Sequence, residues 1–148
     1  MEICMKIIVI DGQGGRMGAL LCEKIRKNKE KLPSGTELIA IGTNSAATAA
    51  MLKAGADCGA TGENPVLVAC RDADFINGPL GIMAADSLLG EVSPAMAVAV
   101  GSSPAQKILL PVNRCNHLII GCKNCSLTEY ISMVCEEVGK EVAKYENR

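Results

Sequence analysis

A glycine-rich run near the N-terminus has the residue types and spacing best suited to chemistry. It reads Gly12-Gln13-Gly14-Gly15-Arg16-Met17-Gly18, with glycines three residues apart at Gly12, Gly15 and Gly18. Glycines in such a run allow a tight turn, close approach of the backbone to a phosphate, and close packing of a helix on a strand. The run therefore predicts an anion site, although a strand-to-helix turn without a ligand would use the same glycines.

The elements on either side of this run are those that a phosphate site needs. Residues 7–10 form an uninterrupted apolar run of Ile and Val, as expected for a parallel strand that is buried on both faces. The helix that follows is predicted to begin at Arg16 or Met17 and to extend towards Lys27. Its first N–H groups and its dipole would favour a negative charge above the turn. The segment therefore predicts the first βα unit of a nucleotide-binding domain.

The glycine run resembles the N-terminal signature of dihydrodipicolinate reductases, which read Gly-x-Gly-Gly-Arg-Met-Gly after their first strand. The resemblance is confined to the first strand, turn and helix. Those reductases also carry a His-rich catalytic segment and a substrate-binding lysine in a second domain, whereas this sequence has one histidine. The resemblance therefore implies a nucleotide-binding half without the half that performs the chemistry.

Over its whole length the sequence resembles a small uncharacterised bacterial family of Rossmann-like proteins with no established activity. This second resemblance supports the fold and leaves the chemistry open. It rests on three stretches, which are Asn77-Gly78-Pro79-Leu80-Gly81-Ile82, Asp86-Ser87-Leu88-Leu89-Gly90-Glu91 and Lys107-Ile108-Leu109-Leu110-Pro111-Val112-Asn113.

Composition limits the classes of function. The 148 residues are expected to form one domain, with 49% apolar residues for its core. A net charge of −1 and only 2% aromatic residues give no electrostatic or stacking surface for nucleic acid. The sequence has no apolar stretch of membrane-spanning length and no leader, so a cytoplasmic protein with reduced cysteines and no membrane contact is expected.

The end of the second predicted strand departs from an NAD site. Residues 37–41 form that strand, and Gly42, Thr43 and Asn44 follow it. A dinucleotide domain normally has an acidic residue there to hold the ribose hydroxyls. Its replacement by small polar residues disfavours NAD, leaves NADP open, and fits another nucleotide or small anion equally well.

The remaining pattern predicts an α/β fold of Rossmann-like, three-layer α/β/α type. Helices are expected at residues 45–54, 64–72, 82–89, 95–100 and 126–144, and strands at 56–60 and 74–77. Asn64 would cap the second of these helices, and Ser126 with Glu129 would form a capping box for the last. A buried strand is the alternative for residues 95–100. The turn after the last of these strands, beginning at Asn77 and Gly78, should reach the same edge as the glycine run.

Residues 107–112 and 117–122 read as an antiparallel hairpin at the edge of an otherwise mostly parallel sheet, with Pro111 favouring an edge position. This hairpin and the sparse surface charge suggest a homodimer.

A cluster of cysteines offers a different kind of site. Cys122 and Cys125 form a C-x-x-C motif, with Cys115 and His117 upstream. Cys122 and Cys125 would suit a redox pair, and all four residues together could hold zinc or an iron–sulfur cluster. Alternatively the cysteines are structural, with Cys122 ending a buried strand and Cys125 packing under the last helix.

Taken together, the sequence predicts a module that binds a phosphate-bearing small molecule or nucleotide. The binding residues would be those from Gly12 to Gly18, framed by Thr43, Asn44, Asn77 and Gly78. An NADP-linked oxidoreductase, or a subunit of one, is the alternative, and a cysteine-based redox or metal protein is the third. Candidate catalytic groups at this edge are Asp11, Arg16, Asn77 and Lys107, with Asp11 expected to bond N–H groups of the turn.

Overall fold

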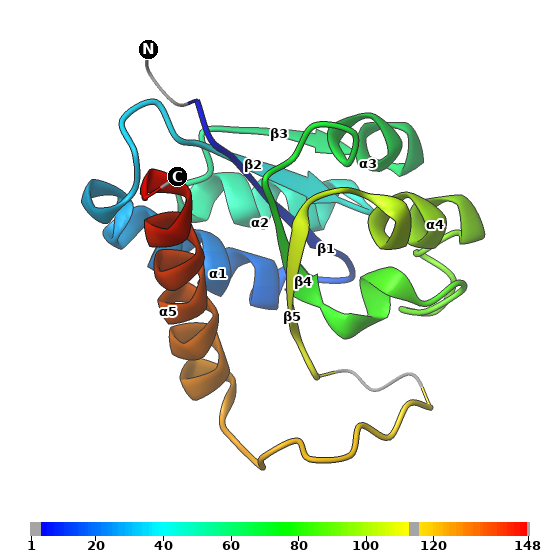
Figure 1. The fold of residues 1–148 in the computed structure, drawn as a ribbon. Helices are drawn as coiled ribbons and strands as arrows, with labels where there is room; N and C mark the ends of the chain where they lie inside the picture. The colour runs from blue at the N-terminus through cyan, green and yellow to red at the C-terminus, as the bar shows by residue number, and fades with distance from the viewer. Residues whose placement is uncertain (1–3, 113–115, 148) are drawn as a thin grey trace.

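The computed structural model describes residues 4–112 and 116–147. Strands and helices alternate along most of this chain (Figure 1). The strands are β1 (Lys6–Asp11), β2 (Glu37–Gly42), β3 (Cys58–Thr61), β4 (Phe75–Pro79) and β5 (Gln106–Leu110). The α-helices are α1 (Arg16–Lys27), α2 (Ser45–Ala54), α3 (Glu63–Ala69), α4 (Pro94–Ser102) and α5 (Leu127–Glu146), with short 3₁₀ helices η1 (Lys29–Lys31) and η2 (Leu80–Met83).

The five strands form one parallel sheet in the order β3-β2-β1-β4-β5. The chain builds outward from β1 to β3 on one side and then crosses over to β4 and β5 on the other. This is the order of a doubly wound nucleotide-binding sheet, and it places the reversal of direction between β1 and β4.

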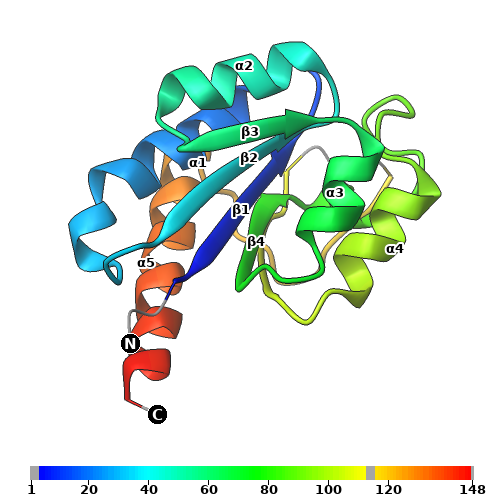
Figure 2. The ribbon, with the colours of Figure 1, turned by 90° about the horizontal axis from the view of Figure 1, so that it is seen from above.

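Helices cover both faces of the sheet, which gives three layers (Figures 1 and 2). Alternate residues of β1 belong to different cores. Ile7 and Val9 pack with α1, α2 and α5, whereas Ile8 and Ile10 pack with α3 and α4. Residues on both faces of β1 are therefore buried, which explains why its sequence is continuously apolar rather than alternating. The predicted α/β class and three-layer arrangement are confirmed.

The segment after β4 differs from the predicted helix over residues 82–89. η2 ends at Met83, and three non-glycine residues beyond it have left-handed backbone conformations: Asp86, Leu88 and Leu89. Such residues cannot continue a right-handed helix. The chain instead forms tight turns, which bury Leu88 and bring Glu91 back to the glycine-rich run after β1.

The starts of α3, α4 and α5 can be compared with the predicted helix boundaries. α3 begins at Glu63 after Gly62, so Asn64 lies inside the helix rather than capping it. Residues 94–102 are helical, capped by the Ser93 hydroxyl, and the strand alternative for that region is wrong. The capping box at Ser126 and Glu129 is confirmed.

The predicted edge hairpin is wrong. β5 pairs in parallel with β4, and within the described residues the sheet has no antiparallel pair. Residues 117–122 form no strand, and Leu118 and Ile120 are 81% and 88% exposed. The physical reason is connectivity, because this segment leads from the carboxyl end of β5 to the start of α5 along the outside of the molecule (Figure 1). The prediction of a homodimer was based on this hairpin and on the sparse surface charge, and the hairpin no longer supports it.

Candidate functional site

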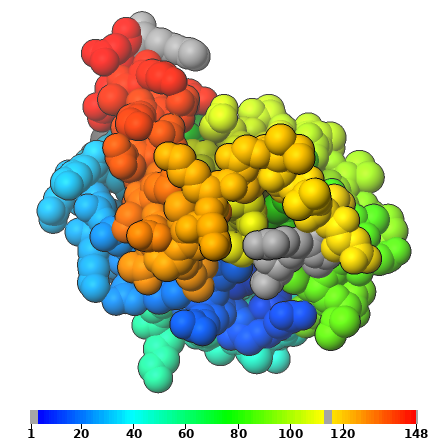
Figure 3. All heavy atoms as spheres, turned by 90° about the horizontal axis from the view of Figure 1, so that it is seen from below, coloured from blue at the N-terminus to red at the C-terminus, as the bar shows by residue number. Residues whose placement is uncertain are grey.

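The candidate site lies where the carboxyl ends of β1, β2 and β4 meet. The glycine loop (residues 12–18) joins β1 to α1, and the segments that follow β2 and β4 approach it. A hollow of about 230 Å³ is lined by residues 11–17 together with Leu88 and Leu127. Figure 3 views this edge, with the blue atoms of the glycine loop between the green segment after β4 and the orange start of α5. Ligands of doubly wound sheets bind at this position.

Asp11 holds the glycine loop from beneath. Its side chain is 4% exposed, and its two carboxylate oxygens accept hydrogen bonds from the N–H groups of Gly12 at 2.8 Å and Gly18 at 2.7 Å. Burial raises the pKa of this carboxyl group, and the two N–H donors oppose that rise. The predicted structural role of Asp11 is confirmed.

Three of the loop glycines are required by packing. A Cβ atom at Gly12 would lie 2.5 Å from Thr43 Oγ1, and one at Gly18 would lie 2.5 Å from the sulfur of Met51. Gly15 has a φ of +70°, and a Cβ atom there would lie 2.6 Å from Cα of Ala47 in α2. These glycines let α1 approach β1 and α2 closely, so they are explained without a ligand.

Gly14 has no such explanation within the described residues. A Cβ atom at this position would meet no other atom within 4 Å, and the backbone is outside the left-handed region. In the part of the chain that is described, the N–H groups of Gly14, Arg16 and Met17 donate no hydrogen bond. These groups lie at the beginning of α1, where the helix dipole favours an anion. Arg16 is exposed beside them and forms no ion pair with a described residue.

The first half of the loop already holds a carboxylate. Glu91 reaches it from the turns after β4, with Oε2 accepting a hydrogen bond from the N–H of Gln13 at 2.6 Å. Its other oxygen, Oε1, accepts from Nδ2 of Asn44 at 2.7 Å. Asn44 also donates to the Gln13 carbonyl oxygen at 2.9 Å and caps α2 through its own side-chain oxygen. The glycine loop, the end of β2 and the segment after β4 are thereby connected.

The remaining predicted framing residues lie at this edge but differ in what they contact. Thr43 Oγ1 is buried without a hydrogen-bond partner among the described residues, next to Gly12. Asn77 is fully buried in β4 beside Val9, and both of its side-chain polar atoms also lack a described partner. Gly78 lies so close to the carbonyl oxygen of Ile10 that no Cβ atom would fit. A buried polar group without a partner is uncommon and destabilising, which makes Thr43 and Asn77 noteworthy at a candidate site.

Sequence reasoning missed Glu91. This residue is separated from Gln13 by 78 positions along the chain, and no periodicity or motif links them. The available signal was indirect: the sequence lacked the expected acidic residue after β2, and the structure places a carboxylate from another segment against Asn44 there.

The predicted cysteine site is only partly within the described structure. Cys115 lies outside the described residues, while Cys122 is exposed and Cys125 is half-buried before α5. Both line a hollow of about 450 Å³ with His117 and Tyr130, and no residue of the glycine loop lines it. The described ranges contain no group of three or more His, Cys, Asp or Glu side chains arranged to hold a metal ion. Cys122 does not end a buried strand as the structural alternative expected.

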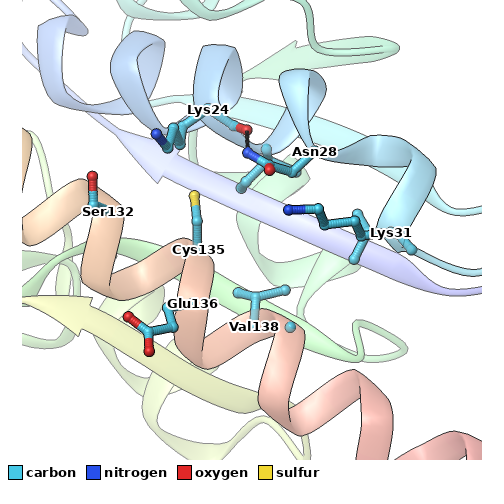
Figure 4. Close-up of a pocket in the computed structure, with 10 residues that line it drawn as sticks. Lys24, Asn28, Lys31, Ser132, Cys135, Glu136 and Val138 are labelled. Atoms are coloured by element: carbon cyan, nitrogen blue, oxygen red, sulfur yellow. Dashed lines mark hydrogen bonds between the residues drawn. The ribbon is translucent and has the colours of Figure 1, made fainter.

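A third hollow, of about 350 Å³, lies between the C-terminal half of α1 with η1 and the middle of α5 (Figure 4). Cys135 points from α5 towards α1, with Lys24 and Lys31 on the opposite wall. Burial raises the pKa of the Cys135 thiol to about 11, so the thiol is protonated at neutral pH and is a poor nucleophile. Although this hollow is larger than the one at the glycine loop, it has no backbone N–H groups at a helix start, and we regard it as a packing gap.

Within the described residues, no helix combines the length and apolar character needed to cross a membrane.

Comparison with known proteins adds a family but no activity. A comparison with curated proteins found no match. Residues 6–143 match a family described as a domain of unknown function, DUF3842, and that match covers β1 to most of α5. The chain therefore belongs to the DUF3842 family.

Proposed function

We propose that this protein binds a phosphate-bearing small molecule, best a nucleotide, at the glycine loop. The phosphate would accept hydrogen bonds from the N–H groups of Gly14, Arg16 and Met17, which donate to no described residue, and pair with the exposed Arg16 guanidinium. Thr43, Asn44, Asn77 and Gly78 would frame the rest of the ligand, as the sequence predicts.

Gly14 is the observation that carries this proposal. The neighbouring glycines are explained by contacts that a Cβ atom would break, but a Cβ atom at Gly14 would meet no described atom within 4 Å, and its φ is not positive. Gly14 lines the hollow at the start of α1, so a side chain here would take up space that we assign to the phosphate. A glycine that the fold does not need, beside free N–H donors, supports a bound anion.

Binding is favoured over catalysis by the contacts of the candidate catalytic groups. Asp11 is buried and already accepts two hydrogen bonds from the loop. Lys107 donates to the carbonyl oxygen of Ser103 at 2.5 Å, on the side of β5 away from its carboxyl end. We therefore rank an NADP-linked oxidoreductase, the alternative that the sequence left open, below the binding module.

Isothermal titration with inorganic pyrophosphate and ADP tests the proposal directly. Wild-type protein is expected to bind both, and Gly14→Val is expected to abolish binding without changing the melting temperature, because its side chain fills only open space. Arg16→Ala should weaken binding by about tenfold or more, the usual effect of one lost charged hydrogen bond.

Gly139→Val is the matched control. Gly139 lies in α5, and a Cβ atom there would also meet no atom within 4 Å, but it borders the hollow of Figure 4 rather than the loop. This variant should bind as wild type does. Binding of both ligands that survives in Gly14→Val would overturn the proposed site, and absence of binding to wild type would overturn the proposed function.

A further inference from the structure

The Glu91 carboxylate occupies the place where a dinucleotide-binding domain needs an acid. That acid normally follows the second strand and holds the ribose hydroxyls. Here the position after β2 is occupied by Thr43 and Asn44, but Oε1 of Glu91 lies 2.7 Å from Nδ2 of Asn44. Oε2 of the same carboxylate lies 2.6 Å from the N–H of Gln13 in the loop. A carboxylate from the segment after β4 thus stands between the end of β2 and the glycine loop.

This carboxylate is held in place and still has capacity to accept. Each oxygen of an ionised carboxylate has two acceptor positions, and the described contacts use one on each oxygen. The two free positions match the two hydroxyl donors of a ribose 2′,3′-diol. Thr43 Oγ1, buried and without a described partner, lies beside the same carboxylate, since a Cβ atom on Gly12 would be within 2.6 Å of both.

The division of the loop leaves room for the phosphates. The Glu91 carboxylate lies against Gly12 and Gln13. The N–H groups of Gly14, Arg16 and Met17, which donate to no described residue, lie further along, at the start of α1. A nucleotide can therefore place its ribose against Glu91 and its phosphates over Gly14 without bringing the two negative charges into direct contact.

The surroundings of Glu91 also oppose a 2′-phosphate. The sequence has no Lys or Arg from Leu32 to Leu52 or from Pro79 to Val92, two of the three segments that meet at this carboxylate. The third segment, the glycine loop, has one cation, Arg16, which the proposed function assigns to the phosphates. A phosphate on the ribose 2′-oxygen would replace a hydrogen-bond donor with a second negative charge beside Glu91, and no cation in these segments would compensate it.

We infer that Glu91 is the ribose-binding carboxylate of this site, so that the protein takes nucleotides with a free 2′-hydroxyl group and rejects those with a 2′-phosphate. This inference rests on the proposed function. It reverses the preference that the residues after β2 alone suggest, because the acid missing from β2 is supplied from the segment after β4.

Two matched ligand pairs test this inference by titration calorimetry. Wild-type protein should bind ADP about tenfold or more tightly than 2′-deoxy-ADP, and NADH more tightly than NADPH. Glu91→Gln should bring ADP down to the affinity of 2′-deoxy-ADP and remove the preference for NADH, because an amide accepts fewer hydrogen bonds and carries no charge. Pyrophosphate, which has no ribose, should bind this variant as it binds wild type.

Glu141→Gln serves as the control, because Glu141 is also a hydrogen-bonded carboxylate. It accepts from Lys144 Nζ at 2.5 Å near the C-terminal end of α5, and it lines neither the glycine loop nor its hollow. This variant should leave every affinity unchanged. If ADP and 2′-deoxy-ADP bind wild type equally, or NADPH binds as well as NADH, the role of Glu91 is refuted while the proposed function stands. If pyrophosphate and ADP both fail to bind wild type, the proposed function and this inference fall together.

Discussion

Asp11 shows how one buried side chain fixes the shape of the candidate site. Its carboxylate joins the first and last residues of the loop through Gly12 and Gly18. Burial, the largest influence, raises the pKa of this group, and the nearby Glu91 charge raises it further. The folded protein therefore binds the Asp11 proton more tightly than the unfolded chain does.

This pKa rise predicts a pH dependence of stability. The stability that protonated Asp11 contributes is fully present below the unfolded pKa, near pH 4, and is lost as the pH rises through the folded pKa. Asp11→Asn cannot titrate, so the free energy of unfolding of wild type minus that of the variant should fall from about pH 4 upward and then level off. Urea unfolding from pH 4 to pH 8 measures it. A difference that grows with pH would contradict the assigned direction.

Residue types alone foretold part of this site. The glycine spacing and the position of Asp11 are local features, and local sequence predicted both the turn and its hydrogen bonds. Asn77 was predicted at this edge, but not its burial without a hydrogen-bond partner among the described residues. Glu91 could not be predicted, because its contacts depend on how the segment after β4 returns to the sheet edge. Under the inference drawn above, Glu91 selects a nucleotide with a free 2′-hydroxyl group, whereas the residues after β2 left NADP, another nucleotide and a small anion open.

At the scale of elements, α5 is the clearest case of a helix defined by its own sequence. Ser126 Oγ accepts from the Glu129 N–H, and the Glu129 carboxylate accepts from the Ser126 N–H at 2.7 Å. The helix then buries Ile131, Val134, Val138 and Val142 at helical spacing against the sheet. Cys135, the residue after Val134, is only half-buried.

Removing the cap should destabilise the protein measurably. Ser126→Ala leaves the Glu129 N–H without its side-chain acceptor and should lower the free energy of unfolding by about 1 kcal/mol. Ser132→Ala, at an exposed position inside the same helix, should change it by less than about 0.5 kcal/mol. Chemical denaturation of both variants measures the difference. Equal effects would mean that the capping box contributes nothing.

The two segments that were predicted wrongly have a common cause. Residues 82–89 have helical composition and residues 117–122 have strand composition, yet the first folds through left-handed residues and the second stays outside the sheet. In both, the connection between elements overrides local propensity. The first must carry Glu91 to the glycine loop, and the second must lead from β5 to α5.

At the scale of the whole molecule, the parallel sheet brings three distant segments to one edge. The order β3-β2-β1-β4-β5 puts the glycine loop, Asn44 and the turns after β4 side by side, although they are far apart in sequence. The alternation of strands and helices predicted that the glycine loop, the end of β2 and the turn at Asn77 share one edge, but not the path of the turns that carry Glu91. The hollow between α1 and α5 is larger and is lined by Lys24 and Lys31, but no α-helix begins there to supply backbone N–H donors.

The most direct test of the central claim is a ¹⁵N–¹H NMR titration of the wild-type protein with ADP, which locates the ligand as well as detecting it. We expect the largest chemical-shift changes at the backbone amides of Gly14, Arg16 and Met17, which donate no hydrogen bond to a described residue. Changes concentrated instead around Lys24, Lys31 and Ser132, in the hollow of Figure 4, would contradict the account, as would a spectrum that ADP leaves unchanged.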